Sequence, residues 1–320
     1  MTGQGWEGMD HRGWRDHEEV RRRLDAGADP ERWGVGGSRP LHRAAAFGSP
    51  ETVAELARRV ADVDALEGDT TALWEALVYR RTENARALAA AGADLGWVGF
   101  GGWTPARLGL AGPEPDLFPR AAGEPGLTEA EQAVADEGRR LTAALGGCYL
   151  DGLGLACVAG IDAEEAIRRL AAAPADPELM EELIEDFLDF DMDESLRYVG
   201  VTTVPGGCVV TQPWGYAPQR TVVMRLLSEG THAYGLYANP KSGNQGCVFR
   251  DGVCEGSDLH PGGGPDVDGS REEVLFAYVH GGNAVSYSLA HAGLRPTDAR
   301  AVTGPPDHWV RLPERDHWAG

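Results

Sequence analysis

A spacing of 32 to 33 residues recurs through the first third of this 320-residue chain, and it restricts the fold more than any other feature. Three short segments align at that interval, and each ends in an aspartate: Asp29, Asp62 and Asp94. A second marker keeps the same phase in the stretches 38–42, 70–74 and 103–107. Two independent markers at one interval predict tandem repeats, each of which buries its apolar face against the next.

The clearest copy of the second marker is the stretch 39–45, which reads Arg-Pro-Leu-His-Arg-Ala-Ala. A proline in the first turn of a helix loses no hydrogen bond and presets the backbone angle, and small alanines let paired helices pack closely. The stretch resembles the ankyrin repeat, whose helix-opening pattern is Thr-Pro-Leu-His-x-Ala. The resemblance implies two helices per repeat, and it implies that His42 is structural and bridges neighbouring loops by hydrogen bonds.

The repeats depart from that family in number and in detail. Only 37–67 and 69–98 look complete, while a partial repeat starts near Trp14 and another ends at Gly112. Trp74 stands where the family has histidine. Because a stack this short leaves apolar ends uncovered, we expect a cap, or docking of the residues from about 126 onward.

The resemblance also implies where a partner binds, namely on the inner helices and at the hairpin tips between repeats. The candidate residues at the tips are Trp33, Val35, Trp97 and Phe100, and those on the inner helices are Arg43, Phe47, Glu75 and Tyr79. Aromatic residues and arginine dominate the energetics of protein interfaces. The alternative is that a second domain of the same chain covers these aromatic groups, and both interpretations stay open.

The rest of the chain predicts a separate domain. We expect a poorly ordered N-terminus over 1–13, the repeats over 14–112, and a Pro/Gly-rich linker over 113–127. The second domain then covers 128–312 and is followed by a short tail over 313–320.

In this second domain, Thr128 and Glu131 form a capping-box pattern at the start of a helix. Another helix begins at Pro177, with Leu179, Leu183 and Phe187 on one face. From about 196 to 254 β-rich runs are separated by turns and by one predicted helix over 217–227, and further helices follow from Ser270. The whole chain is therefore predicted to be α+β, with an all-α repeat stack followed by an α+β domain that has a mainly antiparallel sheet.

The second domain carries a looser resemblance to an uncharacterised domain family of high-GC bacteria. The stretches that support it are 200–201, 212–215 and 237–239, which read Gly-Val, Gln-Pro-Trp-Gly and Tyr-Ala-Asn. Since that family has no assigned reaction, the resemblance implies no catalytic residue.

The formal net charge of −21 limits the class of partner. The densest part is 162–194, where 13 acidic residues stand against Arg168 and Arg169. Such a surface repels phosphate backbones, so we expect no nucleic-acid binding, and it attracts basic proteins. No apolar run is long enough to span a bilayer, and the first ten residues lack a secretory pattern, so we expect a cytoplasmic protein without a membrane contact.

No motif predicts a catalytic, metal or cofactor site. The five cysteines contain no CxxC pair. Asp189, Asp191 and Asp193 begin like a calcium loop, but Glu194 and Gly200 occupy the positions that need glycine and glutamate. The sequence also lacks HExxH and a phosphate-binding loop. We therefore predict no catalytic residue, no metal and no cofactor.

These observations favour a non-enzymatic protein-binding protein, an adaptor or inhibitor whose partner presents a basic or apolar surface. A concrete form is an immunity or antitoxin protein that masks a basic toxin domain. Two other classes stay open. One is a small-molecule or nucleotide sensor, whose pocket would be lined by Trp214, Tyr216, Tyr234, Tyr237 and Asn239, although such residues more often belong to a core. The other is an enzyme with an unrecognised site.

Overall fold

The computed structural model describes residues 5–32, 38–120, 125–147, 151–187 and 190–314. The chain forms two compact units. One, called the repeat unit here, consists of 1–136 together with 264–282. The other, called the sheet unit, consists of 137–263 and 283–320. The predicted α+β class is confirmed, because helices accompany an eight-stranded antiparallel sheet.

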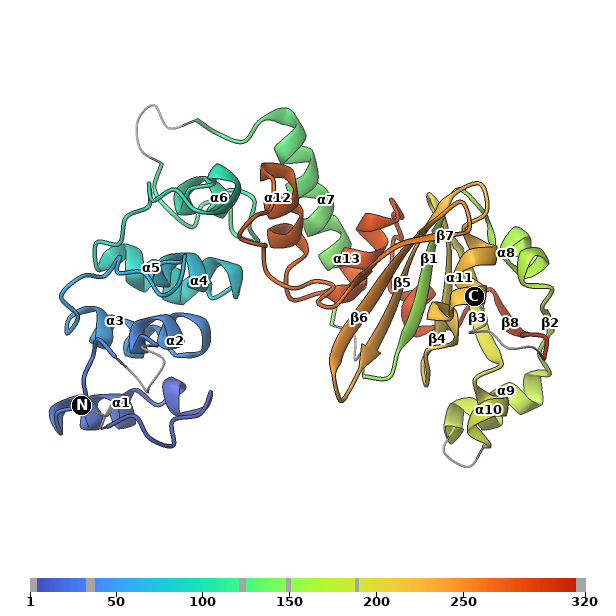
Figure 1. Ribbon diagram of the computed structural model, residues 1–320, viewed down its shortest axis with the longest axis horizontal. Helices are drawn as coiled ribbons and strands as arrows, with labels where there is room; N and C mark the ends of the chain where they lie inside the picture. Colours follow the sequence, from blue (N-terminus) through green and yellow to red (C-terminus); the bar gives the residue numbers. More distant parts are fainter. Residues whose placement is uncertain (1–4, 33–37, 121–124, 148–150, 188–189, 315–320) are drawn as a thin grey trace. The chain divides into compact units, whose positions relative to one another are not determined.

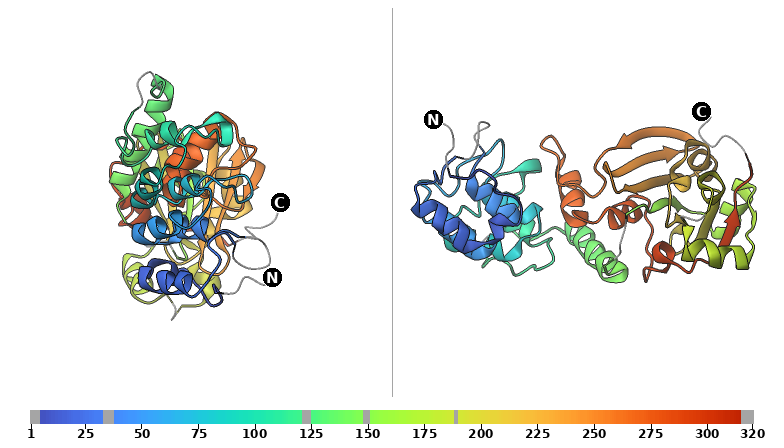
Figure 2. Two further views of the ribbon diagram at one scale, coloured as in Figure 1. Left: turned by 90° about the vertical axis from the view of Figure 1, so that its left-hand side faces the viewer. Right: turned by 90° about the horizontal axis from the view of Figure 1, so that it is seen from below.

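Helix pairs recur along the repeat unit at the predicted interval. The starts of α2 and α4 are 32 residues apart, and so are the starts of α3 and α5. Figures 1 and 2 show these elements stacked in chain order. The helices up to residue 109 are η1 (Gly13–Arg15), α1 (His17–Asp25), α2 (Pro40–Phe47), α3 (Pro50–Ala57), α4 (Ala72–Val78), α5 (Thr82–Ala90), η2 (Phe100–Gly102) and α6 (Pro105–Gly109).

The helix starts follow from local chemistry. The side chains of Ser49, Thr71 and Thr104 each accept a hydrogen bond from the backbone N–H three residues on, which satisfies a donor that the helix leaves free. Proline occupies the first turn of α2, α3 and α6. Ala44 and Ala45 are fully buried, so consecutive helix pairs approach closely.

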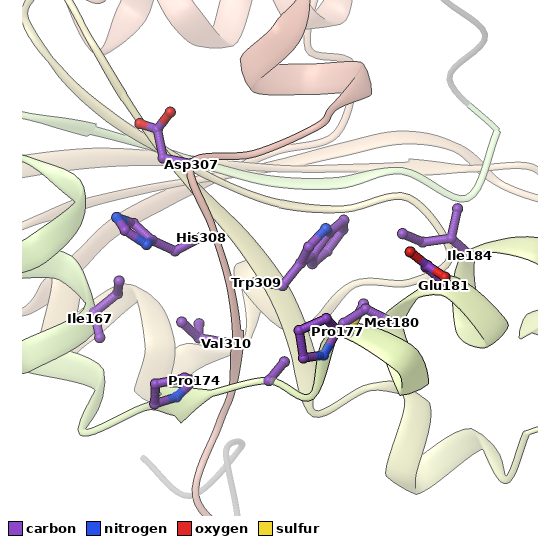
Figure 3. A pocket seen from close by; sticks show the side chains of 11 residues that line it. Ile167, Pro174, Pro177, Met180, Glu181, Ile184, Asp307, His308, Trp309 and Val310 are labelled. Carbon is purple, nitrogen blue, oxygen red and sulfur yellow. The ribbon is translucent and has the colours of Figure 1, made fainter.

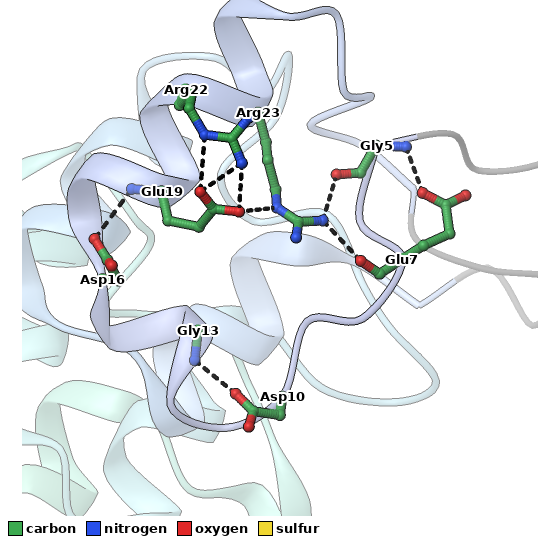
Figure 4. Close-up of polar contacts among 8 residues, drawn as sticks. All are labelled: Gly5, Glu7, Asp10, Gly13, Asp16, Glu19, Arg22 and Arg23. Carbon is green, nitrogen blue, oxygen red and sulfur yellow. Dashed lines mark hydrogen bonds and ion pairs between the residues drawn. The ribbon is translucent and has the colours of Figure 1, made fainter.

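The N-terminal end of the repeat unit is covered by residues that the sequence placed in a poorly ordered segment. Trp6 is fully buried, stacks on Trp14 with ring centroids 5.2 Å apart, and donates its indole N–H to the carbonyl of Asp29. One guanidinium nitrogen of Arg23 donates to the carbonyls of Gly5 and Glu7 (Figure 4). For the described residues 5–13 the prediction of disorder is wrong, because a large buried aromatic ring offsets the Gly-rich composition.

The other end is capped by a segment from far along the sequence. Helix α12 (Arg271–His280) places Val274, Leu275, Tyr278 and Val279 in the same apolar core as the repeat helices. The start of α7 (Glu129–Leu145) also belongs to this unit, up to Asp136. The predicted capping box is present, because Thr128 and Glu131 exchange side chain-to-backbone hydrogen bonds.

The domain borders therefore differ from the prediction in two places. Residues 264–282, which were predicted to belong to the second domain, are part of the repeat unit. The predicted linker over 113–127 contributes the buried Leu117 and Phe118 to the core of the repeat unit. Proline and glycine marked this stretch as irregular, which it is, but irregular backbone can still deliver apolar side chains to a core.

The sheet unit is built on one antiparallel sheet with the strand order β2-β8-β3-β4-β1-β5-β6-β7. Strand β1 pairs with both β4 and β5 and lies in the interior of the sheet. The strands are β1 (Gly154–Ala159), β2 (Ala173–Pro174), β3 (Tyr198–Val204), β4 (Gly207–Gln212), β5 (His232–Asn239), β6 (Gly243–Arg250), β7 (Val253–Asp258) and β8 (His308–Arg311).

Both faces of this sheet are covered, which explains why β1 is apolar throughout. Leu155 and Cys157 pack into the core on one face, together with the end of α7, α13 (Ala284–His291) and α14 (Arg300–Thr303). Ala156 and Val158 pack into the core on the other face, with α8 (Ala163–Leu170) and α11 (Thr221–Leu227), which follows the short turn η4 (Ala217–Gln219).

A third, smaller cluster lies near the β2–β8 edge. Helix α9 (Pro177–Glu185) buries Met180 and Leu183, and Tyr198 joins them. The sequence placed Phe187 on the apolar face with Leu183, but its side chain is 42% exposed. The backbone leaves the helical conformation at Asp186, directly after α9, and the short helix α10 (Met192–Ser195) follows. Within the described ranges, no helix is long and apolar enough to cross a membrane.

Candidate functional site

Two of the predicted binding residues form a partly exposed pair on the repeat unit. Phe47 ends α2 and Tyr79 directly follows α4, so the two occupy equivalent positions 32 residues apart. Their ring centroids are 5.2 Å apart in an edge-to-face arrangement, and the ring of His11 lies 4.4 Å from Phe47. We call His11, Phe47 and Tyr79 the aromatic row. Tyr79 is 46% exposed and Phe47 is half-buried.

The two charged candidates, Arg43 and Glu75, are both half-buried. Glu75 accepts a hydrogen bond of 2.8 Å from the hydroxyl of Thr70. Arg43 lies 3.9 Å from Glu67, at the outer limit of an ion pair. Both residues therefore help to hold the loop before α4.

Trp97 and Phe100, the candidate residues in the loop after α5, pack mainly against the helices of the repeat unit. The ring of Trp97 lies 5.6 Å from that of Trp74 and the ring of Phe100 lies 5.3 Å from it, both edge to face. Trp74 is itself fully buried, so these two side chains extend the core of the repeat unit. The exposed apolar groups in these loops are instead Val98, which stands between the two candidates, and Leu66. Trp33 and Val35, the candidates at the first tip, lie outside the described residues.

His42 has the structural role that the resemblance implied. Its ring is 5% exposed, and Nε2 donates to the carbonyl of Thr70 at 3.0 Å, which ties α2 to the loop of the next repeat. Burial disfavours the charged imidazole and holds the pKa of His42 below its usual value of 6.5. The neutral imidazole tautomer that carries its proton on Nε2 can donate this hydrogen bond to the carbonyl of Thr70.

The thiols of the sheet unit are poorly suited to nucleophilic chemistry. Burial raises the pKa of Cys208 and of Cys247 to about 12, and it raises the pKa of Cys157 as well. Because the thiolate is the reactive form, these three side chains are inert at neutral pH. Cys254 is exposed on the edge strand β7, and Cys148 lies outside the described residues.

The aromatic residues proposed for a sensor pocket make separate contacts. Tyr234 is fully buried and donates its hydroxyl to Asp258 at 2.7 Å. Tyr216 and Tyr237 form a separate edge-to-face pair. Trp214 stacks on Trp309 at the β2–β8 edge, with centroids 5.7 Å apart. These aromatic residues thus belong to different parts of the sheet unit.

A hollow of about 470 Å³ does occur in the sheet unit, between α9 and strand β8. We call it the apolar groove (Figure 3). Met180 and Val310 form its buried floor, and Trp309 and Ile184 lie at its sides. The full lining is Ile167, Pro174, Ala175, Pro177, Met180, Glu181, Ile184, Asp307, His308, Trp309 and Val310. No candidate from the sequence analysis lies in this lining.

Over the described residues, no group of three histidine, cysteine or acidic side chains is arranged to hold a metal ion. The Asp191 carboxylate instead accepts hydrogen bonds from the backbone N–H groups of Asp193 and Glu194 and caps α10. No family model matches the chain, and no curated protein matches it. The ankyrin resemblance and the resemblance of the second domain therefore stay predictions.

Proposed function

We propose that this chain is a non-enzymatic protein-binding protein that contacts its partner through the aromatic row of the repeat unit. The observation that carries the proposal is the edge-to-face pair of the exposed Tyr79 and the half-buried Phe47 on consecutive helix pairs. Tyrosine and phenylalanine are enriched in protein interfaces because they bury a large area at a low cost in conformational entropy.

The position of the pair supports this proposal. Phe47 and Tyr79 occur at the ends of successive first helices, so the tandem repeat presents the same kind of side chain at each step. In proteins of the ankyrin family, which the repeats resemble, the first helices contribute to the binding face. The caps formed by Trp6 and α12 cover the two ends of the apolar core and leave Tyr79 exposed.

The charge of the chain supports a basic partner. A net charge of −21 accelerates association with a basic protein and disfavours nucleic acid. The proposal therefore includes the specific form of an inhibitor, such as an immunity protein, that masks a basic toxin domain in the cytoplasm.

The test is affinity purification from the native host with matched variants. Wild-type protein, Tyr79→Phe, Tyr79→Ser and the control Val253→Ser are each used as bait; Val253 is 64% exposed on β7 of the sheet unit. We expect one basic protein to be recovered with wild type, Tyr79→Phe and Val253→Ser. Its recovery should fall at least about tenfold with Tyr79→Ser, as for an interface residue worth 1.4 kcal/mol or more. Equal recovery with Tyr79→Ser and wild type would contradict the proposal.

A further inference from the structure

We infer that the apolar groove of the sheet unit binds a short basic segment of another protein, one that carries one or two large apolar side chains between lysines or arginines. This surface is distinct from the aromatic row, so the inference stands independently of the function proposed above. Its occupant is specified by two properties of the groove: exposed apolar side chains and unpaired acidic groups around them.

The apolar part of the argument rests on side chains that the sheet unit leaves uncovered. Ile184 lines the groove and is 52% exposed, although it stands one helical turn after the fully packed Met180. Pro177, Met180, Glu181 and Ile184 recur at helical spacing, so one face of α9 forms one wall of the groove. Trp309, on β8, is half-buried and contributes to the other wall (Figure 3). Large exposed apolar groups gathered around a hollow are typical of binding surfaces.

The charged part of the argument comes from the same helix. The stretch 176–194 contains ten acidic residues and neither arginine nor lysine. Around α9, Glu178, Glu181, Glu182 and Glu185 are all exposed, and no arginine or lysine of the described chain forms an ion pair with them. By contrast, Glu194 is paired with Arg311 and Arg197, and Asp307 with Arg300. Of these four, Glu181 lines the groove and Glu185 follows it by one helical turn, so these two unpaired carboxylates border the groove on the α9 side.

These two properties select a basic amphipathic segment over other occupants. Apolar side chains of such a segment fill the hollow between Ile184 and Trp309, while its cations meet the carboxylates of Glu181 in the lining and Glu185 one helical turn later. A second copy of this chain is disfavoured, because it would bring together two surfaces of the same negative sign. A purely apolar molecule would leave the acidic border without a partner.

The experiment uses the full chain and a defined probe. The probe is a 14-residue fluorescent peptide of lysine and leucine, in which the leucines are spaced three and four residues apart so that they lie on one face of a helix. Two control peptides have glutamate in place of lysine, or serine in place of leucine. Fluorescence anisotropy gives the affinity at low and at physiological salt, and a photoreactive leucine analogue in the probe identifies the contacted residues by mass spectrometry.

Two pairs of variants separate the contributions of shape and charge. Ile184→Ser removes the exposed apolar group, and Val253→Ser removes a comparably exposed one from β7. The double variant Glu181→Gln/Glu185→Gln removes two charges beside the groove, and Glu164→Gln/Glu229→Gln removes two exposed charges elsewhere on the sheet unit. All six substitutions in these four variants replace exposed side chains, and unchanged circular dichroism and Tm verify that the fold is retained.

We expect the lysine–leucine peptide to bind wild type and to cross-link to α9 and β8. Binding should weaken about tenfold with Ile184→Ser and with Glu181→Gln/Glu185→Gln, and less than about twofold with the two control variants. Binding should also weaken as salt screens the carboxylates.

Three results would overturn the inference. Equal weakening by both charge variants would show attraction to the net charge alone. Equal binding of the lysine–serine peptide would show that the groove takes no part. Self-association of the chain that is lost with Ile184→Ser would identify a second copy as the occupant.

Discussion

The guanidinium of Arg271 lies over the ring of Trp103, with Cζ 4.0 Å from the ring centroid, and the Trp103 indole donates to the carbonyl of Arg271. The same guanidinium pairs with Glu131 at 2.9 Å, and Arg107 pairs with the other carboxylate oxygen at 2.7 Å. Three segments that are distant in sequence thus meet at one carboxylate and one aromatic ring, all within the repeat unit.

The first prediction concerns this cluster. Arg271→Ala removes a cation from the face of Trp103 and leaves the Glu131 carboxylate, which is only 12% exposed, with Arg107 as its one remaining ion-pair partner among the described residues. We expect the free energy of unfolding of the repeat unit to fall by about 2 kcal/mol, measured by urea titration. Arg21→Ala is the control, since its pair with Glu18 is exposed and should contribute less than about 1 kcal/mol. An equal effect of the two substitutions would refute the role of the cluster.

The second prediction concerns the segment that caps the repeat unit. Gly262 lies against Ala284, where an added Cβ would stand 2.7 Å from the Ala284 nitrogen, so the two ends of the inserted segment are close. Replacing 264–282 with a four-residue Gly-Ser linker should therefore leave the sheet unit folded. The repeat unit should lose the four apolar side chains of α12 and become unstable. Hydrogen exchange followed by mass spectrometry should show fast exchange in α4 and α5 and unchanged protection in β1, β4 and β5. Retained protection in α4 and α5 would contradict the capping role.

The third prediction is a pH dependence that originates at His42. Its pKa in the folded protein is below the usual value of 6.5, so the unfolded chain binds a proton more readily. The contribution of His42 to stability is therefore present above about pH 6.5 and is lost as the pH falls below that value, by at most about 1.4 kcal/mol per pH unit for one proton. Urea titrations between pH 7.5 and 5 should show a smaller decline for His42→Gln than for wild type. Parallel declines would rule out this residue as the origin.

The fourth prediction concerns thiol reactivity. Cys254 is exposed, whereas burial raises the pKa of Cys157 and Cys208. At pH 8, iodoacetamide should modify Cys254 within minutes and should modify Cys157 and Cys208 only after denaturation. Peptide mapping by mass spectrometry identifies each site, and Cys254→Ser provides the matched control. Rapid labelling of Cys157 in the folded protein would require an opening of the sheet.

Much of the fold was predictable because its signals are local. Thr71 and Ser270 cap the helices that they begin, Pro40 occupies the first turn of α2, and the interval of 32 residues between α2 and α4 is visible in the sequence. The partners of these elements were not predictable. Nothing near Arg271 indicates that it contacts Trp103, which is 168 residues away. Strand β8 was missed for a related reason, since its four residues acquire their strand character by pairing with β3.

Among the candidate site residues, too, those with a local signal in the sequence were predictable, and those that depend on contacts between distant segments were not. Tyr79 was identified because the repeat assigns it a position, and it is exposed. Trp97 and Phe100 were selected in the same way, as large aromatic residues in a loop between repeats. In the structure, however, they pack against the ring of the buried Trp74. The apolar groove escaped sequence analysis because it joins residues 167–184 to 307–310, and only the strand pairing brings those ranges together.

The late position of α12 in the sequence determines the order in which the molecule can be completed during synthesis. Residues 1–136 emerge first, but the last part of their core comes from 264–282, and strands β1 to β7 are translated in between. One apolar end of the nascent N-terminal helices therefore stays uncovered until α12 is synthesised, after seven of the eight strands have emerged. A chain truncated before residue 264 would consequently lose the integrity of its first helices as well as its last strand.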